Sequence, residues 1–209
     1  MRGWLHLWSF AVSILAAAVL ISVAAASVGA AAAVATAVYS VTILGLFGVS
    51  ALYHRRTWTT TRSRMIMKRL DHSMIFLFIA GTYTPVSVLA MDAATARWVL
   101  FTVWGGALAG VVLKMAWPAA PSWLAVPVYV ALGWVAVFVF PQMLHNGGVA
   151  AFVLLIAGGV LYTIGAIFYA TKRPDPWPAT FGYHEFFHAA TVLAAACHYV
   201  AIWLVLFPG

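Results

Sequence analysis

Long apolar runs, broken by short polar or proline-containing stretches, extend along the whole chain. A helix needs roughly 20 apolar residues to cross a bilayer, and this length selects seven predicted spans. They lie at residues 8–28, 32–54, 70–90, 97–116, 122–141, 149–170 and 184–206. The least distinct break follows the first span, where only Ser27 and Gly29 interrupt an alanine-rich run. The pattern predicts an all-α integral membrane protein, with residues 1–209 forming one seven-transmembrane helix bundle.

The composition supports a membrane protein without a separate soluble domain. Apolar residues make up 65% of the chain and charged residues only 7%, whereas a soluble domain is about a quarter charged. The single cysteine, Cys197, lies in an apolar stretch and cannot form an intrachain disulfide. The net charge of +7 indicates contact with anionic lipid headgroups and a fixed orientation in the membrane, and not a nucleic-acid partner.

Basic residues lie almost entirely on one side of the predicted topology. Arg97 alone lies in the alternate set of loops. The other set holds Arg2, Arg55, Arg56, Arg62, Arg64, Lys68, Arg69, Lys114, Lys172 and Arg173. The positive-inside rule therefore predicts a cytoplasmic N-terminus and an outer C-terminus. Arg2 and the first apolar run also imitate a secretory signal, but the run is long for one, and cleavage would leave the other six spans oriented as before.

Polar groups occur at one end of three predicted spans, although such groups are costly inside a bilayer. Ser50 and His54 end the second span, Asp71 begins the third, and His184 and His188 begin the seventh. Because successive spans alternate in direction, all five residues are expected at the same depth, near the cytoplasmic face. Residues four apart share one face of a helix, so the serine–histidine pair and the histidine pair should each project in one direction.

These residue types at this spacing predict a metal site. His184 and His188 form an i, i+4 clamp, and His54 would add a third imidazole from across the bundle. Three histidines with one open position are the ligand set of a catalytic zinc site. Asp71 would be an outer carboxylate beside the bound water, and Ser50 would orient that water or a substrate. Each motif alone has a simpler structural interpretation, and three imidazoles also suit other divalent metals; the convergence of the five residues favours the site.

Three further features have their own interpretations. The segment His184–His188 satisfies HExxH, the zinc-protease motif in which Glu185 would be the general base, but no acidic third ligand follows it. His198 lies about 20 Å along the helix axis from His184, too far to share the metal, and we expect a buried, hydrogen-bonded histidine. Gly106 and Gly110 form a GxxxG pattern, which predicts close helix packing.

The motifs in combination resemble a known family. SALYH (residues 50–54), KRLDHSMIFLFIAGTYTP (68–85) and GYHEFFHAATVLAAACH (182–198) resemble the hemolysin III family, the bacterial branch of the progestin and adiponectin receptor (PAQR) superfamily. The resemblance extends over nearly the whole chain, including VWGGALAGVVLK and RPDPWP. It implies a seven-helix bundle in the inner membrane of a bacterial cell that holds zinc near the cytoplasmic face, with the ligands, the aspartate and the serine at the positions named above. The glutamate of HEFFH is not part of the family pattern.

The resemblance also implies a function. The superfamily is similar to the alkaline ceramidases, which implies a zinc-dependent hydrolase of a lipid amide or ester that affects membrane homeostasis, with membrane lipid as its substrate. Three hypotheses stay open beside it: a non-catalytic membrane sensor or modulator with structural zinc, a membrane-lytic protein, and an intramembrane HExxH metalloprotease. The sequence specifies neither the substrate and its binding residues nor the oligomeric state.

Overall fold

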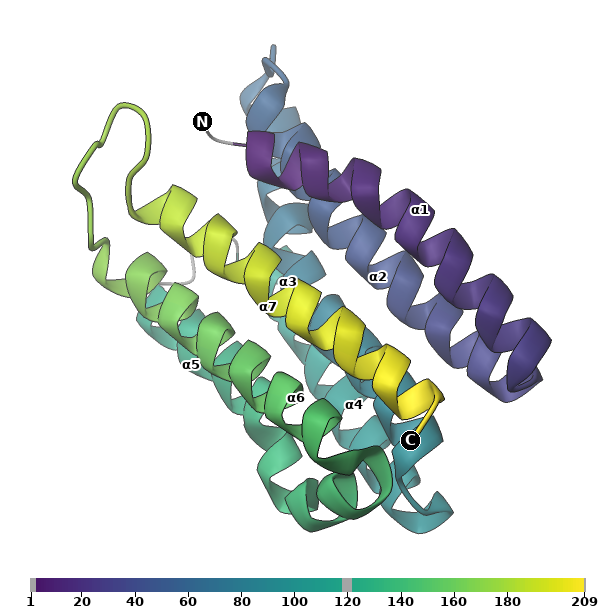
Figure 1. Cartoon of the computed structure of the whole chain (residues 1–209). Coiled ribbons are helices and arrows are strands. Elements are labelled where there is room, and N and C mark those ends of the chain that lie inside the picture. The colour runs from purple at the N-terminus through teal and green to yellow at the C-terminus, as the bar shows by residue number, and fades with distance from the viewer. Residues whose placement is uncertain (1–2, 118–121, 209) are drawn as a thin grey trace.

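The computed structural model describes residues 3–117 and 122–208, and for residues 122–125 it describes the backbone alone. Its elements are helices throughout, in keeping with an integral membrane helical bundle (Figure 1). They are α1 (Trp4–Ser27), α2 (Ala30–Arg55), α3 (Thr61–Ala90), α4 (Ala93–Ala116), α5 (Ser122–Gly133), the 3₁₀ helix η1 (Trp134–Val139), α6 (Phe140–Thr171) and α7 (Tyr183–Leu206).

Six helical segments within the described residues are long and apolar enough to cross a membrane. Five of them are α1 to α4 and α7, and the sixth is Val126–Thr171, which joins most of α5 to η1 and α6. A straight helix of that length would be about 69 Å long, more than twice the apolar thickness of a bilayer. The chain instead leaves the helical conformation at Gly148, where φ is 79°. The predicted all-helical membrane fold is confirmed, whereas the number of crossings and the direction of the termini stay predictions.

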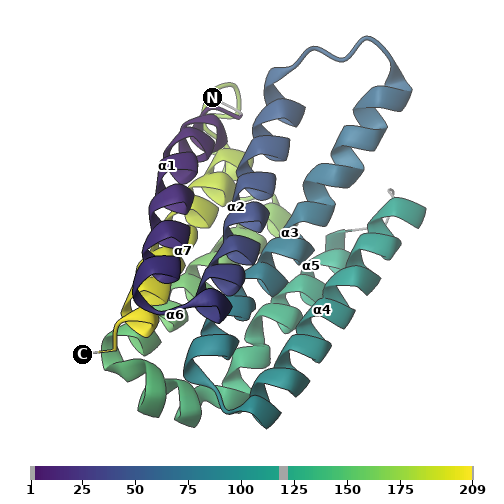
Figure 2. The same ribbon diagram turned by 90° about the vertical axis from the view of Figure 1, so that its right-hand side faces the viewer.

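The helices lie side by side with α3 in the middle of the bundle (Figures 1 and 2). Helix α3 packs against α2, α4, α5, α6 and α7, and α1 contacts both α2 and α7. The start of α1, the α2–α3 connection and the α6–α7 connection lie together at one end, opposite the C-terminus (Figure 1). We call this the basic end, because it carries Arg55, Arg56, Arg62, Arg64, Lys68, Arg69, Lys114, Lys172 and Arg173; Arg2 lies outside the described residues.

Helix α3 extends beyond the apolar segment that its sequence predicts. It begins at Thr61, whereas the predicted span begins at residue 70. The N-cap residue Thr60 explains the start, because its Oγ1 accepts a hydrogen bond from the Ser63 backbone N–H at 3.1 Å. The added turns are polar and basic, so a count of apolar residues cannot detect them. They carry the helix past the apolar part of the bundle at the basic end.

The segment predicted as the fifth span is not one continuous α-helix. Helix α5 contains Pro127 and ends at Gly133, after which the chain continues as η1. The Tyr83 hydroxyl of α3 supports this change, because it donates to the Gly133 carbonyl at 2.6 Å and accepts from the Ala136 N–H at 2.7 Å. Polar backbone groups at membrane depth need such partners, and α3 supplies one here.

The two glycines of the GxxxG pattern allow α4 to approach two different neighbours. A Cβ on Gly106 would lie 2.7 Å from a methyl carbon of Leu132 in α5. A Cβ on Gly110 would overlap the ring of Phe76, which α3 presents with no exposed surface. At either glycine a Cβ would come closer to its neighbour than a normal carbon–carbon contact allows. The predicted close packing of this segment is therefore confirmed.

We expect Gly110→Ala to lower the melting temperature of the detergent-purified protein by several degrees. The added methyl group meets the fully buried Phe76 ring, and overpacking of this kind costs about 1–3 kcal/mol. The matched control is Gly105→Ala in the same helix, where a Cβ meets nothing within 4 Å. Both variants gain the same helix propensity, so their difference measures the clash. Equal melting temperatures would show that Phe76 moves aside freely.

Candidate metal centre

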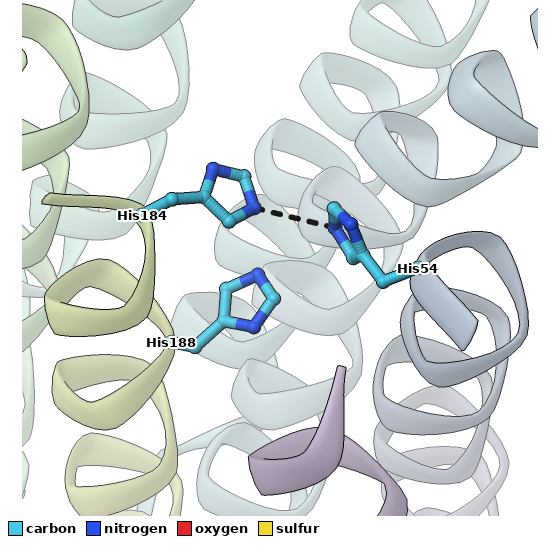
Figure 3. A group of neighbouring side chains, drawn as sticks. All are labelled: His54, His184 and His188. Carbon is cyan, nitrogen blue, oxygen red and sulfur yellow. Dashed lines mark hydrogen bonds between the residues drawn. The ribbon is translucent and has the colours of Figure 1, made fainter. Parts of the chain in front are cut away.

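The last turn of α2 and the first two turns of α7 place three histidines around one space at the basic end. His54 lies in the last turn of α2, and His184 and His188 lie four residues apart in α7. One ring nitrogen from each of the three lies within 4.8 Å of the others. Figure 3 shows the two α7 rings turned toward the His54 ring, which approaches from the opposite helix. The arrangement brings together the three residues that the sequence predicts as metal ligands.

The distances suit a shared divalent ion. Nε2 of His184 lies 3.2 Å from Nε2 of His54. Two nitrogens that bind one tetrahedral zinc at about 2.0–2.1 Å lie about 3.4 Å apart. The same two atoms form a hydrogen bond when one of them carries a proton, and a metal ion would take the place of that proton. Donor type and the His54–His184 separation therefore both suit zinc. His188, whose ring centroid lies 4.6 Å from that of His184, is placed to supply a third nitrogen.

Asp71 of α3 lies beside the histidines. Its Oδ2 is 4.0 Å from Nε2 of His54, the same nitrogen that faces His184. Ser50, one turn before His54 and only 2% exposed, donates a hydrogen bond to this carboxylate. All five predicted site residues thus lie in one cluster drawn from three helices. Their roles in binding and catalysis stay predictions.

Glu185, the glutamate of the HExxH pattern, has a structural role at the start of α7. It is 4% exposed, and its Oε2 accepts a hydrogen bond from the Gly182 backbone N–H at 2.9 Å. This is the contact by which a glutamate in the first turn stabilises a helix N-terminus. This stabilising contact explains why a glutamate stands between the two histidines without requiring that it take part in peptide hydrolysis.

A fourth histidine, which the sequence interpretation missed, also belongs to the cluster. His6 of α1 is 2% exposed and stacks on the His188 ring, with 3.9 Å between ring centroids and 7° between ring planes. Imidazole nitrogens bind metals in the plane of the ring, so two parallel, stacked rings do not share one ion. His6 therefore packs against a candidate ligand. The predicted topology could have indicated this, because residue 6 lies in the first turn of α1, at the end of the bundle where the other three histidines lie.

We expect His6→Ala to weaken zinc binding several-fold, whereas His6→Phe should retain most of the affinity. Phenylalanine keeps an aromatic face against His188 and removes both nitrogens, so the pair of variants separates stacking from ligation. Competition with a chromophoric zinc chelator measures the affinity. A loss in His6→Phe as large as in His6→Ala would show that His6 acts through its nitrogens.

Two other histidines form hydrogen bonds with groups outside the cluster. His198 donates a hydrogen bond from Nε2 to the Leu155 carbonyl at 3.1 Å, which confirms the predicted hydrogen-bonded histidine, although its side chain is half-buried. His72, next to Asp71, is bonded through Nδ1 to the Lys68 carbonyl at 2.7 Å. Neither is among the three histidines whose nitrogens converge.

Comparison with known proteins agrees with this arrangement. A family model described as Haemolysin-III related matches residues 1–199. The chain belongs to the hemolysin III family. It is 34% identical over 140 residues to the Hemolysin-3 homolog of Bacillus subtilis, a match that covers 67% of this chain and 65% of that protein. It is 31% identical over 140 residues to Hemolysin-3 of Bacillus cereus, covering 67% of this chain and 63% of the relative.

The relationship extends to the PAQR superfamily. The human Monocyte to macrophage differentiation factor is 25% identical over 173 residues, which cover 81% of this chain and 69% of that protein. The matches span slightly less than two thirds of the two Bacillus proteins. The predicted membership of hemolysin III within the PAQR superfamily is thus confirmed.

Proposed function

We propose that this hemolysin III-family protein is an integral-membrane, zinc-dependent hydrolase of a lipid amide or ester, with its site near the cytoplasmic face of a bacterial inner membrane. The observation that carries the proposal is the cluster of three imidazoles and the Asp71 carboxylate beside a cavity within the helical bundle. Metal ligands, a proton acceptor and a space for an apolar substrate therefore adjoin one another.

The cavity supports a lipid as the substrate. It has a volume of about 190 Å³, and its wall includes Asp71, His184 and His188. Most of the remaining wall is apolar or aromatic, with Phe76, Phe78, Ile79, Val126, Tyr129 and Val130 among the lining residues. Such a lining accommodates an acyl chain, and the polar groups of the histidine cluster would fix the reacting bond.

The residues of the cluster have distinct roles in this proposal. His54, His184 and His188 would hold the ion; a bound zinc ion supplies a Lewis acid and lowers the pKa of water toward neutrality. Asp71 accepts a proton from the attacking water and later returns it to the leaving amine or alcohol. The water oxygen bonds to the acyl carbon as the C–N or C–O bond breaks. Ser50 donates to the Asp71 carboxylate and fixes its orientation.

A structural role for zinc is the second candidate, and helix packing favours it. The three histidines come from α2 and α7, which make little direct contact with each other. An ion between them would tie the two helices together in a membrane sensor or modulator without turnover. Membrane lysis is a third candidate, favoured by the name hemolysin that the Bacillus relatives carry.

Metal analysis and a lipid assay on the detergent-purified protein separate these functions. The proposal requires about one zinc per chain and chelator-sensitive release of free fatty acid from ceramide-type amides or from lipid esters. Bound zinc without turnover on any lipid in the panel favours the structural role. Dye leakage from liposomes that persists after all three histidines are replaced by alanine favours lysis.

A further inference from the structure

Two lysines of the basic end line the same cavity as the candidate metal centre. Lys114, in the last turn of α4, is only 7% exposed, and Lys68 lies one turn before Asp71 on α3. Both are lining residues of the cavity, together with Asp71 and His184. Helices α3 and α4 pack side by side, which brings the two ammonium groups near one another.

Among the described residues, no carboxylate offsets the positive charges of Lys68 and Lys114. Lys68 and Lys114 lie close enough for their like charges to repel each other, and both also lie near His72. Asp71 Oδ2 lies 4.0 Å from a ring nitrogen of His54 and of His72. Within the part of the chain that the structure describes, no carboxylate forms an ion pair with either lysine. Among the described residues that line the cavity, Asp71 is the only acidic one. A zinc ion would add further positive charge to this region.

A buried ammonium group without a partner is costly, and a bound anion would offset that cost. Much of the remaining wall is apolar or aromatic, with Phe76, Phe78 and Ile79 among its residues, so the anion should be attached to an acyl chain. The chain would lie deeper in the bundle, with the anionic group at the basic end. Lys68, three residues before Asp71 on the same helix, shares roughly one face with it, so the anionic group would lie close to the bond that Asp71 serves.

We propose that Lys68 and Lys114 form a subsite for the anionic head of an acyl lipid, a carboxylate or a phosphate. Its part in selecting a substrate rests on the hydrolase function proposed above, whereas binding itself does not. The subsite would make the protein prefer acidic amphiphiles over neutral ones of equal chain length. Lys114 supplies a partly desolvated charge, and the exposed Lys68 supplies the second cation toward the cytoplasm.

Equilibrium binding to the detergent-solubilised protein tests the subsite. Three fluorescent probes share one acyl chain and carry a carboxylate, a phosphate monoester or a neutral glycerol ester. They are titrated into an Asp71→Asn background, so that no turnover interferes. We expect the carboxylate or the phosphate probe to bind at least about 10-fold more tightly than the neutral probe, and the stronger of the two identifies the natural head group.

The lysine variants decide whether the preference comes from this subsite. Lys114→Gln and Lys68→Gln should each weaken anionic binding about 10-fold and leave neutral binding unchanged, and Lys114→Arg should restore it. The control Arg64→Gln removes one exposed positive charge from the same end of α3 and should have no effect. The Lys68→Gln variant keeps the test valid if loss of the buried lysine impairs folding, because Lys68 is exposed.

Equal binding of all three probes, or a preference that survives Lys68→Gln combined with Lys114→Gln, would overturn the subsite. An equal loss in Arg64→Gln would assign the preference to general surface charge and would also overturn it. Chelator-treated protein should keep the lysine-dependent part of the preference, because that part does not involve the metal. A preference for anions in a protein without hydrolase activity would refute the proposed reaction and leave the subsite standing.

Discussion

Replacement of His188 or His54 by alanine is expected to reduce bound zinc from about one ion per chain to nearly none after dialysis. Loss of a residue that merely supports a ligand lowers metal affinity about 10- to 100-fold, so loss of a ligand should exceed about 100-fold. The two histidines come from different helices, α7 and α2. Elemental analysis of the purified variants gives the metal-to-protein ratio directly.

A thermal measurement provides an independent readout of the same loss. A ligand that binds only the folded state stabilises it by about 4 kcal/mol at 1,000 times its dissociation constant. Zinc should therefore raise the melting temperature of the wild type but not that of the two variants. The matched control is His198→Asn, because His198 lines the same cavity but is bonded to Leu155. Unchanged ratios in His54→Ala and His188→Ala would refute the metal site.

The candidate site was predictable from the sequence because its five residues obey rules that need no tertiary information. The alternation of apolar spans fixes which helix ends lie together, and this brought Ser50, His54 and Asp71 to the same level as the α7 histidines. The i, i+4 spacing of His184 and His188 fixed the direction of that pair. The structure then places Nε2 of His54 3.2 Å from Nε2 of His184, a separation that depth alone does not specify.

The missed features depend on how helices rotate and pack against one another. His6 lies just before the apolar run predicted at residues 8–28, and its stacking on His188 requires a particular rotation of α1 beside α7. From the sequence, Lys114 counts only as one of the basic residues that set the orientation in the membrane. Its burial depends on how α3 and α4 pack against each other, which the sequence does not specify. The early start of α3 at Thr61 depends on a capping threonine within a basic segment that carries no apolar signal. In each case the residue type was evident from the sequence, but the neighbouring helix that it contacts was not.

We expect Asp71→Asn to retain zinc and to lose about 100- to 10,000-fold in the rate of lipid hydrolysis. This range is the usual contribution of a positioned proton acceptor. Asparagine has nearly the same shape and keeps an oxygen that accepts from the Ser50 hydroxyl, but it does not take up the proton of the attacking water. Metal content by elemental analysis and fatty acid release are measured on the same preparation.

Two controls distinguish proton transfer from a general effect of charge or packing. Asp175→Asn removes an exposed carboxylate from the α6–α7 connection at the same end of the bundle and should leave the rate unchanged. Ser50→Ala keeps the Asp71 carboxylate but removes its hydrogen-bond donor, so we expect a smaller loss, about 10-fold. Loss of zinc together with activity in Asp71→Asn would make the aspartate part of the ion's environment and remove the case for a separate base. Full activity would leave the carboxylate, which lies 4.0 Å from a candidate ligand nitrogen, without a chemical role, and would favour an ion that only joins the helices.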